Sequence, residues 1–174
     1  MSQTATYKID DSQVRAWSKV LAMYPELAEP IVVTAMKKSI YAVVAEIKPR
    51  TPVNEGDLLG SIAGRVETLG TIGQIGGEIR GIAESNLDYA FPVEIGRQSG
   101  TWVPIEPLKR WARLVLGDEG AAYAVRAKIY SKGIKGRFMF ARGWMEARPL
   151  VKGFFLDAQE EIIDAVASRA RKGR

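Results

Sequence analysis

"EIKPRTPVNEGDLLGSI", residues 46–62, decides how the first half of the chain is organised. Before it, apolar residues recur every three to four positions over residues 27–47, which predicts a long amphipathic helix. Pro49 ends that helix because proline lacks a backbone donor and clashes with the preceding turn. Asp57 then begins a segment long enough for only one helical turn, which its side chain is expected to cap. The stretch therefore predicts a rigid corner between the long helix and the next element.

Beyond the corner, the sequence changes from helical to alternating periodicity. "AGRVETLG" (63–70) and "GGEIRGIAE" (76–84) each alternate apolar and polar residues, with more glycines between them. Period-two alternation around turn residues predicts a β-hairpin or a short meander. The glycine-rich connection matches neither GxxxxGK[ST] nor GxGxxG, so turn formation explains it better than phosphate binding does.

Helical patterns account for most of the remaining chain. A terminal helix is predicted from about Trp144 to Ala170 because apolar residues recur there at near-heptad intervals. Its expected apolar positions are Leu150, Phe154, Ala158, Ile162 and Val166. The other expected elements are a helix over 12–24, a short helical turn capped by Asp88, a helix pair over 106–117 and 121–134, and a short strand at 137–140.

Strands that cluster between helices, without regular βαβ alternation, are typical of an α+β fold. We expect long N-terminal and C-terminal helices packed on a small antiparallel sheet, with an inserted helix pair. A length of 174 residues fits a single domain over residues 1–174. Within it we expect an N-terminal helical arm over 1–25 and a flexible basic tail over 169–174.

The composition excludes several kinds of chemistry. Cysteine and histidine are both absent, so the chain has no disulfide, thiol nucleophile, Cys/His zinc site or imidazole base. Its acidic clusters fall where helix N-termini and solvated faces usually carry carboxylates. No apolar run approaches the roughly 20 residues that span a bilayer. We therefore expect a soluble protein that is no enzyme, with no catalytic residue, cofactor, metal or membrane association.

The net charge of +5 is modest, and part of it lies in the C-terminal "SRARKGR". "KIYSKGIKGRFMFARGW" (128–144) interleaves lysine and arginine with aromatic residues, a pattern that can follow phosphates while stacking bases. The same pattern is also expected if the aromatic side chains point into the core and the lysines are solvated on the outside. The tryptophans are expected to anchor a core or an interface rather than to stack on bases: Trp17, Trp102, Trp111 and Trp144. A nucleic-acid-binding module that uses residues 128–142 and the C-terminal tail remains the alternative.

Three separated stretches together resemble a family of tailed-phage proteins. "TPVNEGDLLGSI" resembles the "(A/T)PVDTGxLRxSI" element of the neck and minor tail-component family of siphophage-like virions. "YAFPVEIGRQSG" is similar to that family's "YAxxVExGT" element. "GRFMFARGWMEA" is similar to its "PFLxPA" segment, which precedes a long C-terminal helix. The three occur in the family's order over residues 27–170.

The resemblance implies a structural role in the virion. It suggests a homo-oligomeric ring, six- or twelve-fold, that joins the head connector to the tail, with connector, tail-tube and tail-terminator proteins as partners. Contact with DNA in the channel would be non-specific, and assembly would occur in the host cytoplasm. The residues carried over as structural or interface positions are Pro52, Asp57, Ser61, Tyr89, Val93, Glu94, Gly96, Phe138 and Phe140. On this interpretation the corner is a structural joint, in which Ser61 bonds the nearby backbone.

Overall fold

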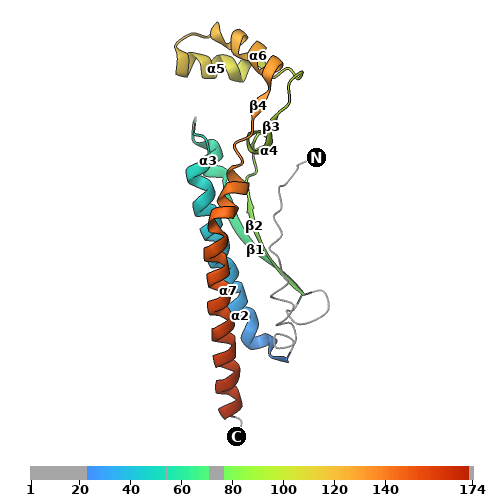
Figure 1. Cartoon of the computed structure of the whole chain (residues 1–174), viewed down its shortest axis with the longest axis vertical. Coiled ribbons are helices and arrows are strands. Elements are labelled where there is room, and N and C mark those ends of the chain that lie inside the picture. Colours follow the sequence, from blue (N-terminus) through green and yellow to red (C-terminus); the bar gives the residue numbers. More distant parts are fainter. Residues whose placement is uncertain (1–22, 54, 71–76, 173–174) are drawn as a thin grey trace. The chain divides into compact units, whose positions relative to one another are not determined.

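Residues 23–53, 55–70 and 77–172 are described by a computed structural model (Figure 1). The chain divides into two units, one made of the segments before and after residues 88–138, and the other made of Asp88–Phe138. The helix predicted over 12–24, nearly all of the arm over 1–25 and most of the glycine-rich connection lie outside the described residues. The α+β prediction, with long helices near both ends and an inserted helix pair, is confirmed.

An antiparallel pair of long helices dominates the first unit. Helix α2 spans Pro25–Ile47 and helix α7 spans Met139–Lys172. Ion pairs near both ends show that the two helices run antiparallel. Arg50, just after α2, lies 4.0 Å from Glu146, and Arg169 Nη1 donates to Glu26 Oε1 at 2.5 Å. The C-terminal end of α2 therefore lies beside the start of α7 (Figure 1).

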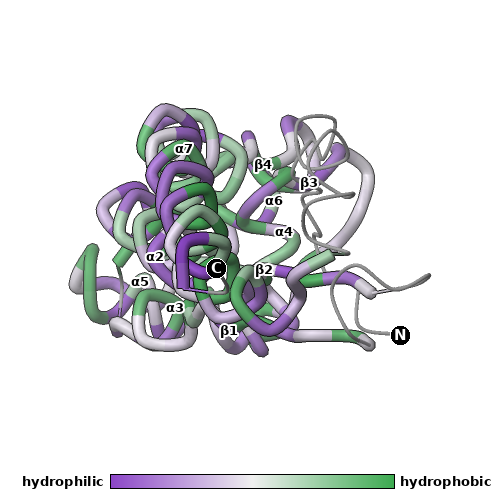
Figure 2. Tube along the Cα trace, turned by 90° about the horizontal axis from the view of Figure 1, so that it is seen from below, coloured by the Kyte–Doolittle hydropathy of each residue, from purple (hydrophilic) through white to green (hydrophobic). Residues whose placement is uncertain are grey.

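Apolar residues at helical spacing form the contact between these helices. On α2, Met36, Ile40, Val43 and Ile47 are buried at intervals of three to four residues; Ile47 meets Gly143 of α7, whereas Met36 and Ile40 meet the sheet. The matching buried positions on α7 are Phe140, Gly143, Ala147, Val151, Ala158 and Ile162. Several are small, which lets the two backbones approach closely. Figure 2 shows hydrophobic and hydrophilic residues both represented around the turns of α7, as expected for a helix covered on one side.

A two-stranded antiparallel sheet lies against α2. Strand β1 (Ala63–Leu69) pairs with β2 (Glu78–Glu84), with Gly64 opposite Ala83 and Gly81 opposite Val66. The two glycines face α2: a Cβ on Gly64 would lie 3.1 Å from Ile40, and one on Gly81 would lie 2.8 Å from the sulfur of Met36. The sheet therefore rests closely on the helix through its glycines.

Residues from both long helices and from the sheet pack together in one apolar cluster. Ile79 of β2 packs against a cluster that contains buried Ala28 of α2 and buried Ile162 of α7. The opposite face of the sheet carries charges, including ion pairs from Arg65 to Glu84 and from Arg80 to Glu78. One face of the hairpin is thus packed and the other is polar, as the alternation in the sequence predicts.

The second unit is a helical hairpin on a small base. Its base contains helix α4 (Ala90–Ile95), strand β3 (Gly96–Arg97) and strand β4 (Ile134–Lys135), and β3 pairs with β4. Helices α5 (Ile105–Leu116) and α6 (Ala121–Lys132) form the hairpin, in which Ala112 and Ala122 are fully buried. Gly117 ends α5 in the left-handed conformation, as expected for a glycine after a helix.

Several local predictions are wrong. The strand expected at 137–140 does not form: β4 lies earlier, and α7 begins at Met139 instead of near Trp144. Leu150 is exposed, and Val151 is buried in the apolar face. Asp88 does not cap α4, which begins after Tyr89. The flexible tail expected over 169–174 stays a prediction: residues 169–172 lie within α7, and residues 173–174 lie outside the described residues.

The contact of Gly143 with Ile47 should limit how α2 and α7 pack. A Cβ on Gly143 would lie 2.6 Å from Ile47 Cγ1 and 2.9 Å from its backbone N and Cα. We expect Gly143→Ala to reduce the free energy of unfolding, because overpacking costs about 1–3 kcal/mol. The gain in helix propensity is at most about 1 kcal/mol. Denaturant unfolding measures the difference.

Gly153 is the matched control on the same helix. No atom beyond its chain neighbours and the backbone of its own helix turns lies within 4 Å of a Cβ built there, so Gly153→Ala should raise the free energy of unfolding by about 0.5–1 kcal/mol. Equal effects of the two substitutions would contradict the close contact.

Candidate functional site

The corner between the long helix and the sheet is held by local hydrogen bonds. A 3-10 turn, η1 (Lys48–Arg50), continues α2. Thr51 then turns the chain: its hydroxyl donates to the carbonyl of Ile47 at 3.0 Å and its N–H to the carbonyl of Lys48 at 3.1 Å. Arg50 donates to the Glu46 side chain at 2.6 Å. Pro52 follows at once and restricts the backbone further.

Asp57 is not the cap of the helix after the corner. Helix α3 spans Asp57–Ser61, and the residue before it, Gly56, occupies the capping position with a φ of 92°. No side chain makes a capping hydrogen bond there. The glycine provides the left-handed turn, so Asp57 lies inside the first turn, where its charge complements the helix dipole.

Ser61 links the corner to the sheet. Its hydroxyl donates to the carbonyl of Leu58 at 2.8 Å, which confirms the predicted bond to nearby backbone. The same oxygen lies 2.7 Å from Ser85 Oγ. A hydroxyl has one hydrogen, so Ser85 is the donor in this second contact when Ser61 donates to Leu58. Ser85 comes directly after β2, so this pair holds both ends of the hairpin together.

In the second unit, the predicted motif residues form a joint made of backbone contacts. The N–H of Arg137 donates to the carbonyl of Val93, and the N–H of Phe138 to that of Glu94, both at 2.9 Å. Gly96 has a φ of 83°, and a Cβ there would lie 2.3 Å from the carbonyl oxygen of Ile134. Only glycine fits this position without a shift of the partner strand.

The nine residues carried over from the family resemblance therefore fall into two groups, one in each unit. Pro52, Asp57, Ser61 and Phe140 belong to the first, and Tyr89, Val93, Glu94, Gly96 and Phe138 to the second. Glu94 and Phe140 are buried, whereas Tyr89 and Phe138 are exposed. Phe138 adopts a φ of 53° in the residue directly before α7. A left-handed conformation is costly for a residue with a bulky side chain.

An exposed aromatic stack in the second unit was missed by sequence analysis. Trp102 is 53% exposed, and its ring stacks on Tyr130 with centroids 4.3 Å apart. The Arg126 guanidinium lies 4.8 Å from the Trp102 ring and donates to the carbonyl of Val103 at 2.9 Å. Trp102 and Tyr130 are far apart in sequence and share no motif, so no local pattern indicates their contact.

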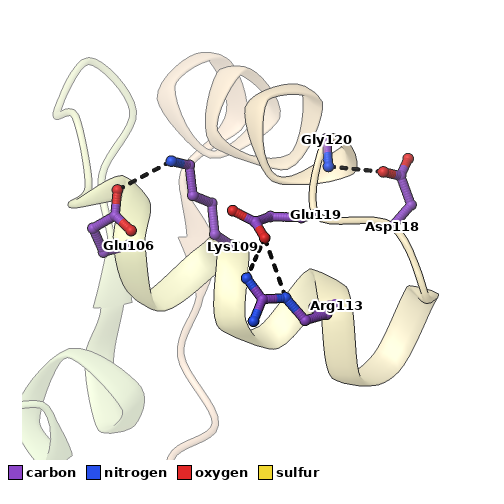
Figure 3. Close-up of polar contacts among 6 residues, drawn as sticks. All are labelled: Glu106, Lys109, Arg113, Asp118, Glu119 and Gly120. Atoms are coloured by element: carbon purple, nitrogen blue, oxygen red, sulfur yellow. Dashed lines mark hydrogen bonds and ion pairs between the residues drawn. The ribbon is translucent and has the colours of Figure 1, made fainter.

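Polar contacts lie along α5 and at the turn of the α5–α6 hairpin (Figure 3). Lys109 pairs with Glu106 at 3.2 Å, and Arg113 Nε donates to Glu119 at 3.1 Å. Asp118 accepts from the N–H of Gly120 at 2.7 Å. The hydrogen bond from Arg113 lowers the pKa of Glu119 below its usual value. The stabilisation by this exposed pair is therefore present above the usual carboxylate pKa and is lost as pH falls through the lowered one.

Within the described ranges, no group of three or more acidic side chains could hold a metal ion. No helix in the part of the chain that the structure describes is long and apolar enough to cross a membrane. Comparison with models of protein families, with curated proteins and with solved structures finds no match.

The strain at Phe138 can be measured with a pair of substitutions. Phe138→Ala and Phe138→Gly both remove the exposed ring, but only glycine adopts a φ of 53° freely. We expect the glycine variant to have a free energy of unfolding higher than the alanine variant by about 1 kcal/mol. Thermal unfolding of the two variants measures this difference. An alanine variant as stable as the glycine variant would show that the left-handed conformation carries no cost.

Proposed function

We propose that this chain is a structural protein of a tailed-phage virion, similar to neck and tail-completion proteins, which assembles into a ring that joins the head to the tail. The observation that carries the proposal is a set of exposed large apolar side chains on well-formed helices. The set includes Leu114, Val115 and Leu116 of α5, Tyr123 of α6, and Met145, Leu156 and Ile163 of α7. Contiguous exposed apolar surface is typical of protein–protein contacts, and Leu114, Val115 and Leu116 are consecutive.

The motif residues support the same role. Thr51, Ser61 and Gly96 hold elements in fixed relation through short hydrogen bonds or close backbone approach. Rigid elements lose little conformational freedom when subunits associate. In a head-to-tail ring each copy contacts two neighbours through different surfaces. The chain would then occupy the virion neck, with connector and tail-tube or tail-terminator proteins above and below it.

Solution mass tests this proposal. We expect light scattering across concentration and salt to show a closed six- or twelve-fold species, and particle imaging to show rings. The same sample is then mixed with connector rings and with tail tubes. A chain that stays monomeric at every concentration, and that binds neither connector nor tail components, would contradict the proposal.

Nucleic-acid binding is the second candidate, favoured by the stacked pair in the second unit. Trp102 and Tyr130 lie beside Arg126, and Lys128 and Lys132 follow on the same helix. Aromatic rings next to basic side chains bind single strands by stacking and by phosphate contacts. In the stretch 128–142, Phe140 is buried at the start of α7, so the rings there that could stack on bases are Tyr130 and Phe138.

A titration with single-stranded DNA separates this candidate from the first. The candidate predicts affinity that falls steeply with salt, because each phosphate contact releases counterions. Trp102→Ala should weaken binding by about 1–3 kcal/mol, with exposed Tyr41→Ala of α2 as the control. Absence of binding at low salt would exclude it.

A further inference from the structure

Helix α2 carries a basic face on the side that turns away from the core. Lys37, Lys38, Tyr41 and Lys48 are all exposed, and the Tyr41 side chain is the large apolar group among them. Tyr41 lies two positions before buried Val43, which at 100° per residue puts the two side chains on nearly opposite sides of the helix. Residues 34–45 contain no acidic side chain. These four residues are the basic face of α2.

Helix α7 carries an acidic face on its own outer side. Leu156 and Ile163 are 45% and 46% exposed and seven residues apart, so they lie on one side of the helix. Buried Ala158 is two positions after Leu156 and lies on nearly the opposite side. Residues 153–168 contain four acidic side chains and no basic one, and all four are exposed: Asp157, Glu160, Glu161 and Asp164. Residues 156–164 are therefore the acidic face of α7.

The charges of both faces are left unpaired within the part of the chain that the structure describes. The ion pairs along the two helices join Arg50 to Glu46 and Glu146, and Arg169 to Glu26. None of them includes a lysine of the basic face or a carboxylate of the acidic face. Within one copy the two faces cannot meet, because each lies opposite the buried side of its own helix. Their charges are thus available to another chain.

We propose that the basic face of α2 in one copy of this chain docks on the acidic face of α7 in a second copy. This inference rests on the proposed ring and names the two surfaces of its subunit contact. Pairing either face with itself would place like charges together, whereas pairing one with the other brings opposite charges together. The two faces are also similar in length, about 16 Å and about 12 Å at 1.5 Å per residue.

The same arrangement gives the contact a direction. Both faces belong to the first unit, so every copy carries one of each. A contact between two different faces repeats head to tail from copy to copy, as ring formation requires. Exposed Tyr41 on one face and Leu156 and Ile163 on the other provide apolar surface that the contact would bury.

Charge reversal with mixing tests the contact. Lys37→Glu/Lys38→Glu and Glu160→Lys/Asp164→Lys each place like charges across it, so each variant alone should assemble at least about tenfold more weakly than the unmodified chain. In an equimolar mixture, every contact between the two variants pairs like-modified or unmodified faces of opposite charge. We therefore expect the mixture to regain the mass of the unmodified assembly, with the variants alternating, as measured by light scattering and native mass spectrometry.

Two further variants make the test specific. Arg142→Glu/Arg148→Glu changes the net charge by the same amount as the lysine variant, at exposed positions of α7 outside both faces, and should leave assembly unchanged. Leu156→Gln removes an exposed apolar side chain without altering charge. It should weaken assembly, and mixing it with Lys37→Glu/Lys38→Glu should not restore it. Circular dichroism of each variant verifies that the monomer is folded.

The outcomes separate this inference from the proposed function. Assembly of Lys37→Glu/Lys38→Glu alone at normal strength, or a mixture that stays dissociated, would overturn the α2–α7 contact, while a ring of the unmodified chain would still support the virion role. If the lysine variant assembled normally but lost affinity for single-stranded DNA, the basic face would be a nucleic-acid surface instead. An unmodified chain that never self-associates would also overturn the contact, and binding to connector rings or tail tubes would then decide the virion role.

Discussion

The close approach of α2 and α7 at Gly143 is the constraint on which the first unit depends. The backbone of Ile47 occupies the space that any larger residue at position 143 would need. Ile47 is also where α2 passes into the corner, because the hydroxyl of Thr51 donates to its carbonyl. The helix–helix contact therefore holds the point from which the chain turns toward α3 and the sheet. Interiors packed at this density transmit small shifts instead of absorbing them.

A second constraint of the same kind organises residues 88–138. Three glycines approach carbonyl groups of the facing segment: Gly96, Gly133 and Gly136. The α5–α6 hairpin extends from this base with little apolar core of its own, since alanines are its fully buried residues. The core of this unit is small, and many of its larger apolar side chains are exposed. Contacts that cover these side chains would therefore stabilise the unit further.

The virion proposal uses these two properties together. Closely packed joints present fixed surfaces, and large apolar side chains are exposed on α5 and on α7. The exposed stack of Trp102 on Tyr130 offers a different use of the second unit, in which bases rather than a subunit would cover aromatic rings. The two uses differ in a physical property: the affinity for DNA falls steeply with salt because of its phosphate contacts, whereas the affinity of subunit association depends mainly on the buried apolar area.

The sequence by itself determined the elements that depend on local chemistry. Periodicity predicted the long helices and the hairpin, Pro49 marked the corner, and Gly117 marked the end of α5, because each acts through its own backbone or its own face. Tertiary structure decided what depends on distant residues. Phe140 became part of α7 because buried contacts favour a helix over the strand that its neighbours suggest. The capping position went to Gly56 rather than Asp57 because the turn needs a positive φ. The Trp102–Tyr130 stack, the Ser61–Ser85 pair and the exposed faces of α5 and α7 arise only when segments far apart in sequence meet.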